Sequence, residues 1–154
     1  MKTKTTVLLE LWIEARTRFT NQLDGISETD LTKKLGSSPN SAGFLIRHIG
    51  EVELLFAKNV FGDNSVKVSA KTVMEKRDTG EWTDLQELKN YVATSFEKLK
   101  NIVTHQYDED WETAITTKEF GTKTKAEAFG RIISHTTYHA GQLAIVKKYG
   151  ATNS

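Results

Sequence analysis

The stretch TKAEAFGRIISHTTYHAGQLAIVKKYG, residues 124–150, carries the clearest helix signals in the chain. Thr124 and Glu127 have the spacing of a capping box, and Gly150 provides a C-terminal stop. Lys147 and Lys148 lie in the last turn, where positive charge complements the helix dipole. The stretch therefore predicts one long helix, and the residues on its inner face bear on both the fold and the function.

The inner face of this predicted helix is polar in its middle. At alternating steps of four and three, the stripe reads Ala128, Ile132, His135, His139, Gln142, Val146 and Tyr149. Burying polar groups without partners costs roughly 1–3 kcal/mol each, so His135, His139 and Gln142 need hydrogen-bond or metal partners. His135 and His139 are four residues apart, the spacing with which a divalent metal takes two ligands from one helix. The stripe predicts either a metal site or a buried hydrogen-bond network.

Three earlier segments also have helical periodicity with start or stop signals at their ends. The first covers about residues 5–23, the second about 38–61 and the third about 83–103. Ser38-Pro39 is a capping serine with proline at the first helical position, and Thr83 with Gln86 is a second capping-box pair. Four helices with polar outer faces predict an all-α four-helix bundle, formed as a single domain by residues 1–154.

Two of the connections have features of their own. Residues 62–81 show no strong period, and a connector of this length could run along the whole bundle and let the second and third helices lie parallel. Residues 111–117 alternate and are rich in β-branched side chains. Together with residues 120–122 they predict a small hairpin before the last helix.

The composition excludes several classes of protein. At 38% hydrophobic residues the chain can bury a core. Its 21 basic and 20 acidic residues are interspersed, which argues against a nucleic-acid-binding face and a polybasic membrane anchor. The absence of cysteine excludes thiolate metal sites and a cysteine nucleophile. No uncharged apolar window of about 18 residues and no signal peptide occur, so we expect a cytoplasmic protein.

The second predicted helix has a histidine at about the same level along the bundle as His135 and His139. The core stripe of that helix reads Ser41, Leu45, His48, Val52 and Leu55. His48 lies roughly 13 Å from the start of its helix, and the midpoint of His135 and His139 lies about 18 Å from either end of theirs. These levels agree within a helical turn, so a three-histidine site is feasible. The fourth histidine, His105, lies near the end of the third helix, where it is expected to cap carbonyls or face solvent.

Other known site chemistries lack their motifs. None of the four histidines has a glutamate three residues before it, as a di-iron carboxylate bundle requires. The residue after His135 is Thr136, whereas a zinc protease has glutamate there. No glycine-rich phosphate loop and no Gly-x-Ser-x-Gly elbow is present.

Two motifs in the chain resemble those of a known family. Residues 135–142, HTTYHAGQ, resemble the His-x-x-x-His-x-Gly-Gln signature of the DinB/YfiT-like superfamily, which is unrelated to the lesion-bypass polymerase. Residues 41–51, SAGFLIRHIGE, resemble the second-helix motif of that family. The helix order, the spacing and the total length agree over nearly the whole chain.

The resemblance implies a bundle of up-down-down-up topology, in which His48, His135 and His139 hold a divalent metal, most often zinc or nickel. It also implies that Gly141 allows a close helix approach and that the protein forms a homodimer. Characterised relatives include enzymes that use a low-molecular-weight thiol, as S-transferases or as a maleylpyruvate isomerase. A small-molecule substrate together with such a thiol is therefore expected.

Three positions beside the metal motif depart from the family pattern. Many relatives have an acidic residue after the first histidine of the pair, a further histidine before the second and a basic residue after it. Here these positions are Thr136, Tyr138 and Ala140. The three ligand positions are kept, so the departures concern substrate handling.

Three functional hypotheses follow. The first is an enzyme in which the metal binds a thiol and presents it as thiolate, with metal-dependent hydrolysis as a variant. Here Glu51, one turn beyond His48, could orient a ligand or act as a base, and Gln142 could donate to a metal-bound oxygen or lock two helices together. The second is a non-catalytic metal-binding or stress-response module. The third is a metal-free bundle whose histidines form a buried hydrogen-bond network.

Overall fold

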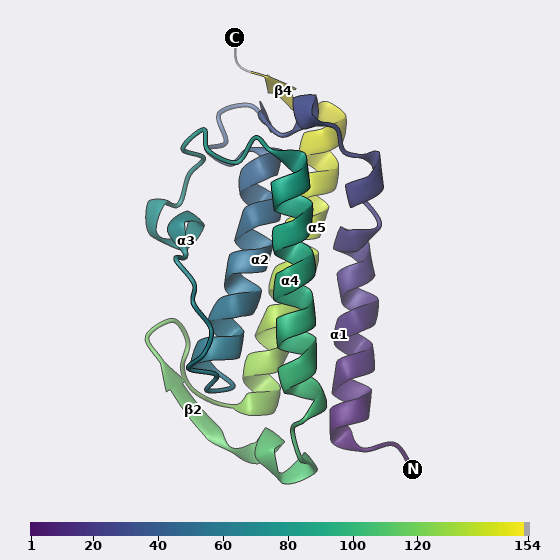
Figure 1. Ribbon diagram of the computed structural model, residues 1–154, viewed down its shortest axis with the longest axis vertical. Coiled ribbons are helices and arrows are strands. Elements are labelled where there is room, and N and C mark those ends of the chain that lie inside the picture. Colours follow the sequence, from purple (N-terminus) through teal and green to yellow (C-terminus); the bar gives the residue numbers. More distant parts are fainter. Residues whose placement is uncertain (153–154) are drawn as a thin grey trace.

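The computed structural model describes residues 1–152, which are mostly helical (Figure 1). Within these residues, the long helices are α1 (Lys4–Thr20), α2 (Ala42–Asn59), α4 (Leu85–Thr104) and α5 (Lys125–Tyr149). They lie side by side, with α2 in contact with both α4 and α5, and α1 in contact with the same two helices. The prediction of a mainly helical chain is confirmed.

The direction of the long helices follows from the connector between α2 and α4. In Figure 1, α1 and α5 run one way along the molecule, and α2 and α4 run the other way. The connector returns along the outside of α2, which allows α2 and α4 to run in the same direction. It contains a short helix, α3 (Lys71–Glu75), which the sequence did not predict because five residues are too few to show a helical period.

Several helix ends differ from the predicted ones by a few residues. The cap of α2 is Ser41, whose Oγ accepts from the Phe44 N–H at 3.1 Å, so the Ser38-Pro39 start was wrong. Asp84, not Thr83, caps α4 by accepting from the Glu87 N–H at 2.8 Å. Neighbouring residues at both sites can accept this bond, and sequence alone does not say which of them does. The predicted capping box of Thr124 with Glu127 at the start of α5 is confirmed.

The strands are short and lie at the ends of the long helices. β2 (Ala114–Thr117) and β3 (Gly121–Thr124) form the predicted hairpin, and their antiparallel pairing is closed by a turn. β1 (Lys33–Lys34) pairs with β4 (Ala151–Thr152), a contact that the sequence did not predict. The remaining elements are short 3-10 turns: η1 (Leu23–Gly25), η2 (Glu28–Asp30) and η3 (Asp108–Glu112).

The buried apolar side chains form two clusters along the helices. One contains Ile49 of α2 with Ala140 and Leu143 of α5, and the other contains Trp12, Trp111 and Phe129. On α5 the change of cluster falls between Ile132 and Ala140, the interval that holds the two predicted ligand histidines. The polar middle of the stripe therefore separates two apolar regions. Tyr149, placed on this stripe by the sequence pattern, is instead exposed.

A buried ion pair, which the sequence analysis missed, ties three helices together. The Arg16 guanidinium of α1 lies 2.9 Å from a Glu53 carboxylate oxygen of α2, and both side chains are almost fully buried. The same guanidinium donates to the Val92 carbonyl of α4 at 2.8 Å. Burial raises the pKa of Glu53 to about 7, although Arg16 acts in the opposite direction. Removing one partner of such a pair typically destabilises a protein by about 3–5 kcal/mol.

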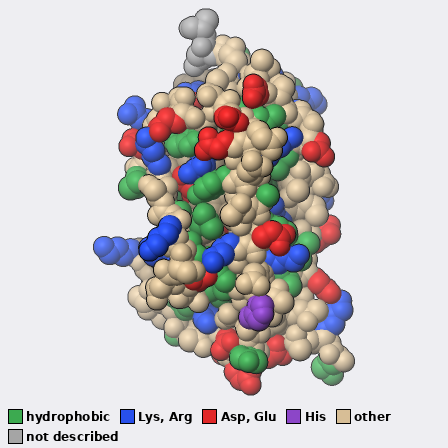
Figure 2. Space-filling view, viewed as in Figure 1, with side chains coloured by type: hydrophobic (Ala, Val, Ile, Leu, Met, Phe, Trp, Pro, Cys, Tyr) green, Lys and Arg blue, Asp and Glu red, His purple; other side chains and the backbone are tan. Residues whose placement is uncertain are grey.

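The outer surface carries charges of both signs. Figure 2 shows acidic and basic side chains intermingled over the face in view. Along the described residues, no helix is both long enough and apolar enough to cross a membrane.

The tightest glycine contact lies at a different glycine from the one expected, and it is with two connecting segments and not with another helix. A Cβ on Gly141 would meet no atom within 4 Å, so the expectation that this glycine allows close approach was wrong. A Cβ on Gly43, at the start of α2, would lie 2.0 Å from the Trp82 carbonyl oxygen and 3.2 Å from that of Leu31. Both neighbours are backbone atoms, which cannot rotate away.

We therefore expect opposite effects from alanine at these two glycines. Gly43→Ala should lower the free energy of unfolding by about 2 kcal/mol or more, because the backbone must shift. Gly141→Ala should raise it by up to about 1 kcal/mol, because alanine favours an exposed helix interior. Urea denaturation of both variants measures the difference, and equal stabilities would contradict the assignment.

Candidate metal centre

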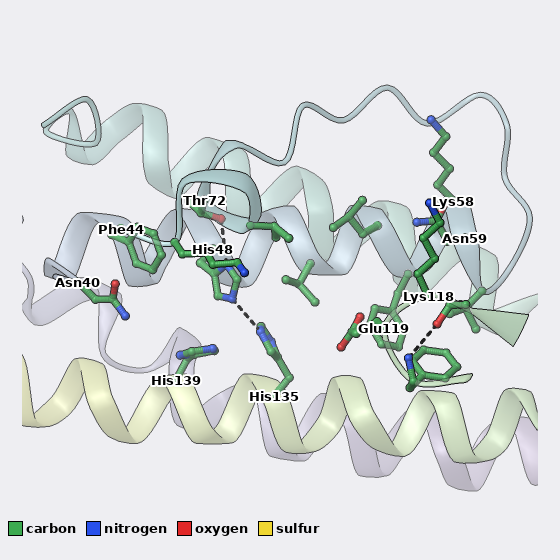
Figure 3. Close-up of a pocket in the computed structure, with 18 of the residues that line it drawn as sticks. Asn40, Phe44, His48, Lys58, Asn59, Thr72, Lys118, Glu119, His135 and His139 are labelled. Atoms are coloured by element: carbon green, nitrogen blue, oxygen red, sulfur yellow. Dashed lines mark hydrogen bonds between the residues drawn. The ribbon is translucent and has the colours of Figure 1, made fainter. Parts of the chain in front are cut away.

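The structure brings three histidines together from two helices. His48 of α2 and His135 and His139 of α5 offer ring nitrogens that all lie within 4.8 Å of one another. The ring centroids are 4.4 to 4.9 Å apart. Figure 3 shows the three rings facing the space between α2 and α5. The convergence expected from the sequence is therefore present.

His48 is oriented by a chain of two hydrogen bonds that reaches a buried carboxylate. Its Nδ1 lies 2.9 Å from Thr72 Oγ1, and Thr72 Oγ1 lies 2.5 Å from Glu51 Oε2. Because a carboxylate accepts, the hydroxyl donates to Glu51 and accepts from Nδ1–H of His48. This assigns the ring proton to Nδ1 and leaves the lone pair of Nε2 directed at the other histidines.

Glu51 is itself held by further donors. It is completely buried, and it accepts from the Thr72 backbone N–H at 2.9 Å and from Arg47 Nε at 3.0 Å. Its carboxylate thus joins α2 to the first turn of α3. Glu51 does not line the cavity described below, so the structure places it behind His48.

His139 is oriented in the same way by Gln142. Its Nδ1 donates to Gln142 Oε1 at 2.6 Å, which leaves the Nε2 lone pair free. Gln142 lies outside the cavity that the three histidines line, one helical turn along α5. His48 and His139 therefore each have Nδ1 occupied by a protein acceptor, as metal-ligating histidines commonly do.

His135 is the ring whose hydrogen bonds the protein leaves incomplete. Its Nε2 lies 3.0 Å from Nε2 of His48, and its buried Nδ1 has no partner among residues 1–152. A ring nitrogen that faces another ring nitrogen can be satisfied by a shared proton or by a shared cation. The donor set, three imidazoles with no carboxylate, suits zinc, nickel or copper better than magnesium or calcium. The residues present therefore fit a divalent transition metal.

Burial keeps the three imidazoles uncharged. It lowers the pKa of His48 to about 4, with a further contribution from His139. It lowers the pKa of His135 to about 3, and the neighbouring histidines and Arg131 act in the same direction. The pKa of His139 is also lowered by burial, although its bond to Gln142 opposes this. All three rings are neutral at pH 7, the form that binds metal.

The histidines lie at one end of a cavity of about 940 Å³. Its walls come from α2, from the connector around α3, from the β2–β3 hairpin and from α5. Phe44 stacks on the His48 ring, with centroids 5.5 Å apart and planes 12° from parallel. A site of this kind combines an oriented donor set with room for a small molecule.

The fourth histidine and the three positions that depart from the family pattern lie outside the site. His105 caps α4, with its Nδ1 2.7 Å from the Asn101 carbonyl, and takes no part in the site. Of the positions that depart from the family pattern, Thr136 and Ala140 are buried and Tyr138 is largely exposed, and none of them lines the cavity. Sequence reasoning missed Thr72, because the connector has no period that would predict where its side chains point.

Solved structures of similar fold include a DinB-like protein of Bacillus subtilis, at a TM-score of 0.68 and 20% identity, covering 92% of this chain and 90% of that one. A conserved protein of Enterococcus faecalis has a TM-score of 0.74 at 16% identity, with 97% and 98% covered. A mycothiol-dependent maleylpyruvate isomerase has a TM-score of 0.72 at 16% identity, covering 93% of this chain and 63% of the isomerase. At these identities the likeness shows the fold alone.

Comparison with the curated proteins found no match. The family model described as the DinB superfamily matches residues 11–143, which contain His48, His135 and His139. This match covers most of the chain, and the solved structures of similar fold include a DinB-like protein. The chain therefore belongs to the DinB superfamily.

Proposed function

We propose that the protein is a divalent-metal-dependent enzyme that activates a low-molecular-weight thiol for transfer to a second small molecule. The observation that carries the proposal is the set of three neutral imidazoles, two of them oriented by Thr72 and Gln142, at the end of a 940 Å³ cavity. His48, His135 and His139 would hold zinc or nickel. A bound metal with three neutral ligands would supply Lewis acidity, which lowers the pKa of a thiol. The similar fold of a mycothiol-dependent isomerase adds support.

The protein's own residues have separable tasks in this proposal. Thr72 and Gln142 hold the proton of His48 and of His139 on Nδ1, and Glu51 holds the Thr72 hydroxyl. Glu51 and Gln142 are thus proposed as positioning residues rather than as groups that touch substrate. The cavity beside the rings favours an enzyme over a purely structural metal module, which would need no space for a ligand.

Two further parts of the proposal rest on the sequence and the family resemblance. A homodimer and a cytoplasmic location stay predictions. Metal-dependent hydrolysis uses the same donor set and stays the alternative reaction, and a non-catalytic metal-binding module stays the alternative function.

Metal loading followed by a thiol-conjugation assay tests the proposed function. The purified protein should bind about one equivalent of zinc or nickel and conjugate a low-molecular-weight thiol to an electrophile. His135→Ala should weaken metal binding at least 100-fold and abolish conjugation, whereas His105→Ala should leave both unchanged. Elemental analysis and product formation are the measurements. A loaded protein that is inert toward thiols and electrophiles would support the non-catalytic module instead.

Thr72→Val should weaken metal binding roughly 10- to 100-fold, because valine keeps the shape of threonine but cannot accept from His48 Nδ1. Thr72→Ser keeps the hydroxyl and should restore most of the affinity. Calorimetric titration with zinc measures both variants. ¹⁵N chemical shifts of the His48 ring in the metal-free protein should show loss of the Nδ1–H preference in Thr72→Val alone. Unchanged affinity and shifts would contradict the assigned role of Thr72.

The metal-free protein should lose stability as the pH falls from about 6.5 to about 4. The unfolded chain takes up protons on histidine near pH 6.5, whereas the folded chain does not until about pH 4 at His48 and about pH 3 at His135. Each of these two rings should cost roughly 2 kcal/mol between pH 7 and pH 5. Urea denaturation at the two pH values measures the loss. The loss should be smaller in His135→Gln and unchanged in His105→Gln.

A further inference from the structure

The cavity has a second end that the proposed metal chemistry does not use. In Figure 3, Lys58 and Lys118 lie at the opposite end of the cavity from His139 and Phe44. Lys58 follows His48 by ten residues on α2, which corresponds to about 15 Å along the helix axis. A ligand that reaches both ends must therefore be elongated.

The wall between the two ends is apolar where α2 forms it, and Glu119 lies beside it, between His135 and Lys118 (Figure 3). Val52, Leu55 and Phe56 line it from α2, and Phe120 lines it from the β2–β3 hairpin. The Phe56 and Phe120 rings lie with their centroids 6.5 Å apart. The middle of a ligand in this cavity would thus contact hydrocarbon on the α2 side, with Glu119 as the one charged side chain between the two ends.

The lining of the cavity carries an excess of positive charge. It contains three lysines, Lys58, Lys76 and Lys118, against one carboxylate, Glu119. Glu119 already lies 3.5 Å from Arg131. Within residues 1–152, no carboxylate lies in ion-pair distance of Lys58 or Lys118. The chain as a whole has a net charge of only +1, so this excess is local.

We propose that the natural ligand of this cavity is an elongated amphipathic carboxylate, whose anionic end lies between Lys58 and Lys118. Its apolar middle contacts Val52, Leu55, Phe56 and Phe120, and its other end reaches the histidines. The inference rests on the proposed function only for the histidine end, where a thiol or another metal-binding group would lie. The lysine end depends on charge complementarity, which needs no metal.

Calorimetric titration with defined probes at 0.15 M salt tests this inference. On zinc-loaded protein, 11-mercaptoundecanoate should bind at least 10-fold more tightly than 11-mercaptoundecanol, which has the same thiol and chain but no charge. The double variant Lys58→Gln/Lys118→Gln should remove this preference and change the binding of the alcohol less than twofold. The short acid 3-mercaptopropanoate should be insensitive to the double variant, because it cannot span the cavity.

A matched control removes the same charge elsewhere. Lys67→Gln/Lys148→Gln changes two lysines that do not line the cavity, and it should keep the preference for the acid. An equal loss in both double variants would overturn the inference, because general electrostatics would then explain the effect. Equal binding of acid and alcohol by the unmodified protein would overturn it as well.

Titration of metal-free protein with undecanoate, which has no thiol, tests the anion site separately from the proposed function. Binding of undecanoate that is weakened at least 10-fold by Lys58→Gln/Lys118→Gln supports the anion site even if no metal is ever found. Binding of undecanoate that is insensitive to the lysines, or no binding, overturns the anion site even if zinc binds tightly to the histidines.

Discussion

The structure depends on the contact of α2 with α5, which holds three uncharged imidazoles together at steep angles to one another. Rings whose nitrogens lie within 4.8 Å of one another cannot all carry a positive charge without strong repulsion, and burial removes the water that would screen this repulsion. The apolar clusters on either side of the rings keep them buried. Thr72 and Gln142 then assign the remaining protons to the outward nitrogens of His48 and His139. The fold thus determines both the charge and the direction of the donor set.

Helical periodicity carried most of what could be predicted from the sequence. A helix fixes which residues share a face, so the spacing of His135 and His139 and the depth of His48 were enough to place three rings together. Thr72 could not be found in this way, because its position depends on the path of an irregular connector. The Arg16–Glu53 pair was missed for a related reason: charged residues on a helix are expected to face solvent, and only the packing of three helices shows that these two do not.

The glycines also show that sequence alone does not tell which residues make close contacts. A glycine in a motif attracts a structural explanation, yet Gly141 faces open space, whereas Gly43 lies against backbone from two distant segments. Which of them is required depends on neighbours that are far away in sequence. The cavity beyond the histidines is likewise built from four separate parts of the chain, so its apolar wall and its lysines could be recognised only in three dimensions.

The hydrogen bond between Thr72 and His48 comes from a different part of the chain than the helices that carry the three histidines. Two of the three rings belong to α5 and one to α2, but the group that assigns the proton of His48 comes from a five-residue helix outside the four long ones. Replacement of that short segment would alter the basicity and the angle of one imidazole, and it would also remove the two donors by which Thr72 holds the buried Glu51 carboxylate. Alternative segments grafted between residues 62 and 81 would therefore change the partner of one imidazole nitrogen while all three rings stay on α2 and α5.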